Sequence, residues 1–209
     1  MASLWLASRD PVMERVAAGE PVADAELLGL LASRELALDW VDDRETYDQL
    51  ATAFAELAFR AGAAGVSGRA ALGQAIEATR AGLARAPADP KDWMQLGYLL
   101  MLRDGDPSRA AAEAFLFSIR TGALQAPDFL RRRLFWSLAH WAFYDEAEQR
   151  QVAEHIRLAW RVAPGGVADL ALYGPEFHGP IAAALEEVPA AQRQFLAALA
   201  FATPISAGD

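Results

Sequence analysis

The chain has 209 residues, of which 54% are hydrophobic and 22% charged, with a formal net charge of −9 and no cysteine. This length and apolar content suit one domain of ordinary size, or two small ones, and exclude a wholly disordered chain. The lack of cysteine excludes disulfide scaffolds and cysteine-ligated metal sites. No apolar run approaches the roughly 20 residues of a membrane span, and an acidic chain is a poor match for nucleic acid.

Alanine and arginine dominate the composition. The chain holds 47 Ala, the best intrinsic helix former. Its 19 basic residues are 18 Arg and Lys91, a usage that we associate with GC-rich bacterial genomes. Residues 1–60 carry 12 Asp and Glu against 5 Arg, so the N-terminal part is predicted to be the most acidic surface. Such a surface either meets a basic partner or only keeps the chain solvated.

The first eight residues are apolar but too short, and too poor in basic residues, for a signal peptide or an anchor. We expect a first helix whose Leu4, Trp5 and Val12 dock on the next hairpin. The alternative is a chain that begins directly after a removed signal or anchor. The compartment therefore stays open between the cytoplasm and the periplasm of a bacterium.

The apolar spacing is helical along nearly the whole chain. Glu20-Pro21 predicts a turn and Asp24 an N-cap, and the helix after them has the apolar stripe Leu27, Leu28, Leu31, Leu38 and Trp40. Further helices are expected at residues 44–61, 70–86, 91–103, 107–121, 127–143, 145–162, 175–187 and 190–201. Pro107 and Pro127 stand where a first helical position would be, and 62–68 is expected to be a loop. Since no run alternates with period 2, the fold class is all-α.

The segment Trp93-Met94-Gln95-Leu96-Gly97, preceded by the helix-ending Pro87, resembles the signature Trp-x2-Leu-Gly of the tetratricopeptide repeat (TPR). A second, weaker copy consists of Trp136, Ala139, Phe143, Val152, Ile156, Ala159 and Pro164. A third consists of Tyr47, Leu50, Ala51 and Phe54. The spacing of 43 residues between Trp93 and Trp136 departs from the regular 34, and His140 stands where a small residue is usual.

The resemblance implies a right-handed superhelix of antiparallel helical hairpins, in which small residues such as Gly82 and Gly97 let paired helices approach closely. We expect one continuous domain in three parts. N-terminal helices over 1–43 pack on the repeat core, about three hairpins span 44–164, and helices over 165–209 cap the array.

No catalytic constellation is present in the sequence. There is no cysteine and no Gly-x-Ser-x-Gly elbow, and the glycine-rich stretch 62–68 has neither a preceding strand nor a following lysine. His140, His155 and His178 lack the spacing of a metal motif and are interpreted as packed or partly exposed imidazoles. We therefore expect no enzyme, no cofactor and no metal.

Two sets of residues are candidates for binding. The TPR resemblance places groove positions on two helices, where Met and aromatic side chains suit an adaptable peptide groove. These positions are Met94, Tyr98, Met101, Ser137, Trp141 and Tyr144. The alternative is that neighbouring helices bury them. A carboxylate clamp is not expected, because Met94 and Tyr98 stand where such clamps carry polar or basic residues.

The second set is Arg131, Arg132 and Arg133. Successive helical residues point about 100° apart, so at most two can join Arg120 or Arg157 in an anion site. The alternative is a solvated face that pairs with Asp128 or Glu154.

These observations favour a non-catalytic TPR-like module that binds a protein or peptide partner within a bacterial complex. The alternative function is an accessory protein of the cell envelope that binds a small anionic ligand or glycan through Trp136, Trp141, Tyr144 and the arginines. An enzyme on an unusual helical scaffold is the least favoured. Fold alone does not decide between these functions.

Overall fold

The computed structural model describes residues 10–105, 107–122 and 126–202. Over these ranges the chain is built from helices and contains no strand, so the expected all-α class is confirmed. The chain divides into two compact units, Met1–Asp106 and Pro107–Asp209, each with its own helix contacts. The expected docking of Leu4 and Trp5 lies outside the described residues.

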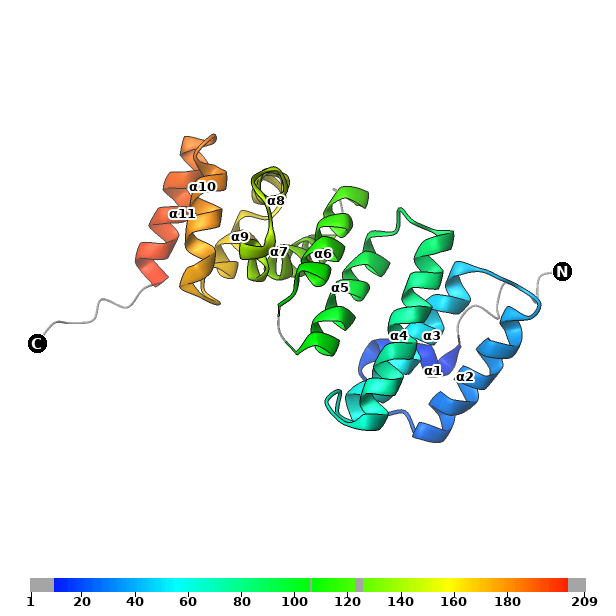
Figure 1. Ribbon diagram of the computed structural model, residues 1–209. Helices are drawn as coiled ribbons and strands as arrows, with labels where there is room; N and C mark the ends of the chain where they lie inside the picture. Colours follow the sequence, from blue (N-terminus) through cyan, green and yellow to red (C-terminus); the bar gives the residue numbers. More distant parts are fainter. Residues whose placement is uncertain (1–9, 106, 123–125, 203–209) are drawn as a thin grey trace, which may run out of the picture. The chain divides into compact units, whose positions relative to one another are not determined.

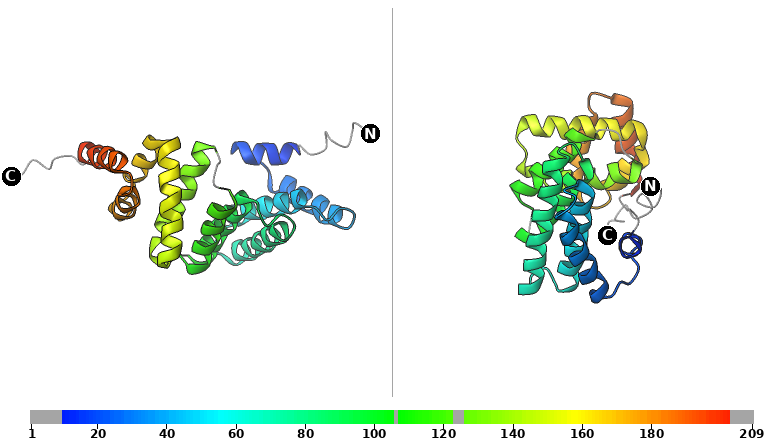
Figure 2. Two further views of the ribbon diagram at one scale, coloured as in Figure 1. Left: turned by 90° about the horizontal axis from the view of Figure 1, so that it is seen from above. Right: turned by 90° about the vertical axis from the view of Figure 1, so that its right-hand side faces the viewer.

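The first unit is a row of helices in chain order. Its helices are α1 (Pro11–Ala18), α2 (Asp24–Leu38), α3 (Arg44–Arg60), α4 (Val66–Arg85) and α5 (Pro90–Asp104). Each of α2, α3 and α4 packs on the next helix, and α1 contacts both α2 and α3 (Figures 1 and 2). Short connections join consecutive helices, as expected for helical hairpins.

The α2 helix buries only part of its expected apolar stripe. Leu27 and Leu31 are buried against Leu50 and Ala51 of α3, in a cluster that also takes in Val12 from α1. In contrast, Leu28 is exposed and Trp40 lies beyond the end of the helix, 85% exposed. Those two members of the predicted stripe do not face the core. Asp24 is the first helical residue, and the N-cap is Ala23.

The turn between α3 and α4 is tighter than the sequence indicated. The expected loop over 62–68 ends early, because α4 begins at Val66. Gly62 takes a φ of +74°, the left-handed conformation that glycine adopts at low cost. The backbone of Gly68 then lies directly against the Gly62 carbonyl, where a Cβ on Gly68 would overlap it. The absence of a side chain at Gly68 therefore allows helix α4 to start this close to the end of α3.

A charged pair joins the start of α3 to the start of α5. Arg44 donates from Nε and Nη2 to the two carboxylate oxygens of Asp92, both at 2.9 Å, and Asp92 is buried. Gly82 of α4 lies beside this pair, since a Cβ added there would be 3.5 Å from Cβ of Tyr47 and 3.8 Å from the Asp92 carboxylate. Gly82 therefore lies close to residues of α3 and α5, but this approach leaves room for a Cβ and does not require a glycine.

The second unit contains shorter elements. They are α6 (Arg109–Thr121), α7 (Pro127–Ala139), the 3-10 helix η2 (Trp141–Phe143), α8 (Glu146–Val162), α9 (Pro164–Leu170), the 3-10 helix η3 (Pro175–Phe177), α10 (His178–Leu185) and α11 (Pro189–Ala202). Helix α8 contacts α6, α7, α9 and α10, and α10 in turn packs on α11 (Figures 1 and 2). The core around α8 includes Leu134, Val152, Ile156, Ile181 and Phe195.

Several helix boundaries in the second unit differ from those expected. Pro107 is not in α6, because Ser108 caps that helix with a hydroxyl that accepts from the Ala111 amide. The expected helix over 127–143 ends at Ala139 and continues as η2. The largest difference is α9, since Pro164-Gly165-Gly166 opens a helix instead of closing a hairpin. Proline is favourable at a first helical position, and buried Val167 and Leu170 hold the helix in place.

The start of α8 is strongly fixed. The Asp145 carboxylate accepts from the Glu148 amide at 2.8 Å, and the Glu148 carboxylate accepts from the Asp145 amide at 3.0 Å, which forms a capping box. Arg109 of α6 donates two hydrogen bonds, of 2.6 and 2.7 Å, to the carboxylate of the same Glu148. Both groups of contacts hold the pKa of Glu148 below its ordinary value.

Among the helices of the described residues, none has the length and apolar character needed to cross a membrane. The division into parts 1–43, 44–164 and 165–209 stays a prediction, as does the handedness of the helical array.

Candidate functional site

The predicted groove positions on α5 lie on one face. Met94, Tyr98 and Met101 are spaced by four and three residues, and all three are half-buried. They are neither core residues nor fully open to solvent. Their role in binding a partner stays a prediction.

The later groove positions have different environments. Ser137 is completely buried and Tyr144 is 5% exposed. The Tyr144 hydroxyl donates to the Ala112 carbonyl at 3.1 Å, and burial raises the pKa of this tyrosine. These two residues therefore lie in the interior, as the alternative interpretation had it. Trp141 is half-buried and lines a groove of about 480 Å³ between α8 and α10.

The three consecutive arginines are divided between surface and core. Arg131 and Arg132 are exposed, whereas Arg133 is completely buried. Arg133 donates from Nη1 to the Ser118 carbonyl at 2.7 Å and from Nε to His155 Nε2 at 3.2 Å. Of the three candidates for an anion site, Arg133 is therefore inaccessible from the surface, and an anion-binding role of Arg131 and Arg132 stays a prediction.

The buried Arg133 guanidinium has neutral partners in its described hydrogen bonds. Burial lowers the pKa of Arg133 to about 10. Burial, with the charge of Arg133 as a second cause, lowers the pKa of His155 to about 3. His155 is thus neutral at ordinary pH. Because its Nε2 accepts a hydrogen bond, the ring proton sits on Nδ1.

His140 is a packed core residue. Its ring lies 5.0 Å from that of Phe115, and its Nδ1 is 2.8 Å from the Trp136 carbonyl oxygen. Burial lowers the pKa of His140. Within the described residues, no group of three His, Asp or Glu side chains could hold a metal ion. The interpretation of His140 and His155 as packed imidazoles agrees with this geometry.

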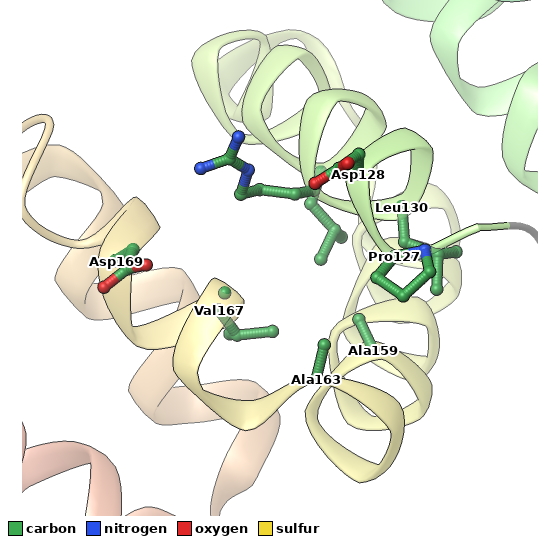
Figure 3. A pocket seen from close by; sticks show the side chains of 10 residues that line it. Pro127, Asp128, Leu130, Ala159, Ala163, Val167 and Asp169 are labelled. Carbon is green, nitrogen blue, oxygen red and sulfur yellow. The ribbon is translucent and has the colours of Figure 1, made fainter.

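A pocket lies where α7, the end of α8 and α9 meet, and we call it the α7–α8–α9 pocket. It has a volume of about 290 Å³. It is lined by Pro127, Asp128, Leu130, Arg131, Leu134, Ala159, Ala163, Gly166, Val167 and Asp169. Figure 3 shows Asp128 on α7 and Asp169 on α9 at separate edges, with Val167, Ala163 and Ala159 between them along one side. The pocket thus has apolar walls and a charged rim.

Local sequence explains how this pocket forms. Leu130 and Leu134 are one helical turn apart on α7 and are 2% and 0% exposed. Small residues at Ala159 and Ala163 leave space opposite them. Gly166 stands beside the rim, since a Cβ there would lie 3.9 Å from Cδ of Arg131 and 3.9 Å from Cβ of Ala163. The pocket therefore forms where the small residues Ala159, Ala163 and Gly166 line it together with Leu130 and Leu134.

The charges on the rim are of both signs. Arg131 supplies a guanidinium, and Asp128 and Asp169 supply carboxylates. Asp128 is in the first turn of α7, where the helix dipole favours a negative charge. Such a rim is able to pair with the backbone or the charged side chains of a bound segment, while the walls take an apolar group.

Comparison of the chain with protein-family models, with curated proteins and with solved structures gives no match. The structure itself defines the class: the chain is an all-α protein in which adjacent helices pack as helical hairpins. Membership of the TPR family stays a resemblance carried by Trp93–Gly97.

Sequence reasoning identified Arg131 but missed the rest of this pocket. Four lining residues, from Ala163 to Asp169, lie at the boundary expected between the last hairpin (44–164) and the capping part (165–209). The signal that was available is the pattern Pro164–Leu170, in which a proline at a first helical position precedes Val167 and Leu170 at i, i+3 spacing.

Proposed function

We propose that this chain is a non-catalytic interaction module of a bacterial complex, built from TPR-like hairpins in a right-handed superhelix. Its work is to bind a segment of a protein partner. The observation that carries the proposal is the α7–α8–α9 pocket, with apolar walls inside a rim of three charged side chains.

The size of the pocket suits a peptide anchor better than a whole ligand. About 290 Å³ is at the low end of the range for small-molecule sites, and its walls are Leu, Ala and Val side chains. One or two apolar side chains of a partner segment fill such a space. Arg131 then pairs with a carboxylate or a backbone carbonyl of the segment, and Asp128 and Asp169 take its amides or basic groups.

A second candidate function is the binding of a small anionic ligand or glycan. The observation that favours it is the groove between α8 and α10, where Trp141 lies with Arg150 and Arg157. An aromatic ring beside guanidinium groups suits a sugar ring with acidic substituents. The same groove also contains the carboxylates of Glu146, Glu154 and Glu187, which oppose an anion. We therefore rank this function second.

The test is to fill the pocket. Replacing Gly166 by leucine places a side chain beside Arg131 and Ala163, and its Cβ makes only ordinary contacts there. The matched control is Gly165→Leu, since a Cβ at Gly165 meets nothing within 4 Å. Both changes add the same side chain to the same helix, but only Gly166→Leu occupies the pocket, because Gly165 does not line it.

The assay is selection of binders from a displayed library of random peptides, followed by titration of the enriched peptides. We expect an enriched apolar motif that binds the native chain and the Gly165→Leu variant equally and loses at least about tenfold in affinity with Gly166→Leu. Equal binding to both variants contradicts the proposal. A different outcome favours the second function. In that case no peptide is enriched, and uronic-acid oligosaccharides shift the NMR signal of the Trp141 indole.

A further inference from the structure

The most exposed aromatic side chain described in the first unit stands at the end of α2. Trp40 is 85% exposed, in the turn between α2 and α3. Val41 beside it is 55% exposed, and Leu36 in the last turn of α2 is 63% exposed. We call these three residues the Trp40 tip. Single exposed apolar residues are common on protein surfaces, but three together around a tryptophan are typical of an interaction site.

Negative charge surrounds this apolar tip. Glu35 and Asp39 are exposed, and they flank Leu36 and Trp40 in the sequence. The last turn of α2 contains no basic residue, although the negative end of the helix dipole favours one there. Asp42, whose side chain is 60% exposed, follows Val41 directly. This arrangement is unfavourable for the isolated helix, and a positively charged partner surface at the tip relieves it.

The nearby arginines of the first unit already have partners. Arg85 pairs with Asp42, and its guanidinium lies 4.3 Å from the centre of the Tyr47 ring. Arg44 is held by Asp89 and Asp92. Neither of them neutralises Glu35 or Asp39 through a described ion pair.

We propose that the Trp40 tip docks on the basic surface of another protein, one in which Lys or Arg side chains border an apolar cleft. Trp40 enters the cleft, and the basic side chains lie over Glu35, Asp39 and the face of the indole. A second copy of this chain is a poor occupant, because it brings the same carboxylates and a net charge of −9. The proposal concerns the first unit and does not depend on the α7–α8–α9 pocket.

The experiment selects peptides on the full native chain from the same kind of displayed library of random peptides, and then titrates the enriched peptides against the native chain and Trp40→Ala. We expect enrichment of peptides in which Arg or Lys flank apolar residues. Trp40→Ala should weaken their binding by about thirtyfold, the change typical of a hot-spot tryptophan. The matched control is Phe59→Ala at the far end of α3, which removes an aromatic ring that is 68% exposed and should change nothing. Thermal melting checks that both variants fold.

A variant without the flanking charges tests the role of the carboxylates separately from the role of Trp40. Glu35→Gln combined with Asp39→Asn keeps Trp40, and it should weaken binding several-fold at low salt and reduce the salt dependence of the affinity. Equal affinities for the native chain and Trp40→Ala show only general attraction to an acidic protein and overturn the proposal. Peptides that lose affinity with Trp40→Ala but are neutral or acidic overturn it too, as does a native dimer that Trp40→Ala converts to a monomer. Loss of these peptides with Gly166→Leu, and not with Trp40→Ala, assigns them to the pocket and overturns the role of the tip.

Discussion

The buried contact between Arg133 and His155 leads to a defined pH dependence of stability. The folded chain holds the pKa of His155 at about 3, against 6.5 for an ordinary histidine. A lowered folded pKa means that the unfolded chain binds the proton first as the pH falls. The stabilising effect of the neutral ring is therefore complete above about pH 6.5 and decreases steadily as the pH is lowered towards 3.

The size of this effect follows from the unfolded state alone. Between about pH 7.5 and pH 5.5 the unfolded histidine gains its proton, whereas the folded one stays neutral. Each pH unit below the unfolded pKa costs about 1.4 kcal/mol, so this interval costs about 1.4 kcal/mol. The result does not depend on whether the folded pKa is 3 or one unit higher. The interval also stays above the sequence pI of about 4.9, where solubility is lowest.

The assay is urea unfolding of the native chain and of His155→Gln at the two pH values. Glutamine offers a neutral acceptor to Arg133 but does not titrate. All other groups are common to both proteins, so the difference between their pH-dependent losses isolates His155. We expect the variant to lose about 1.4 kcal/mol less than the native chain. Equal losses would refute the reasoning, because they would mean that His155 ionises normally and does not lie against a buried guanidinium.

Two further predictions concern stability. Gly68→Ala should destabilise the chain by about 1–3 kcal/mol, because the new Cβ overlaps the Gly62 carbonyl. In the same helix, a Cβ at Gly73 meets nothing within 4 Å, so Gly73→Ala should stabilise the chain by up to about 1 kcal/mol. Thermal melts of both variants check this pair. Equal changes in melting temperature would contradict the close approach of Gly68 to the Gly62 carbonyl. Asp145→Ala should cost about 1 kcal/mol by removing the cap of α8, and Asp145→Asn should cost much less. Chemical unfolding that shows no difference between these two would argue against the capping box.

The periodic parts of the fold were predictable from sequence. Helices α3, α5 and α8 begin and end within about two residues of their expected bounds, because apolar spacing, Pro90 and Asp145 all point to the same boundaries. The start of α4 was missed for a physical reason. The glycine-rich stretch 62–68 indicates a loop, whereas Gly68 is the residue that lets the first turn lie against the Gly62 carbonyl.

The candidate sites were less predictable, because burial depends on neighbours that are distant in sequence. Nothing local distinguishes Arg133 from Arg131 and Arg132, and only the packing of α6 and α8 places Ser118 and His155 around it. Trp40 was assigned to an apolar stripe by its spacing, but α2 ends at Leu38 and the stripe ends with it. Periodicity indicates a face only as far as the helix continues.

The order of the helix contacts has a consequence for how the chain acquires its structure. The main contacts join helices that are at most two apart in the numbering, such as α2 with α3, α8 with α10, and α9 with α11. Closing such short loops costs little chain entropy, and chains dominated by local contacts fold quickly. Each hairpin is therefore able to form soon after it leaves the ribosome, before the following helices have been synthesised.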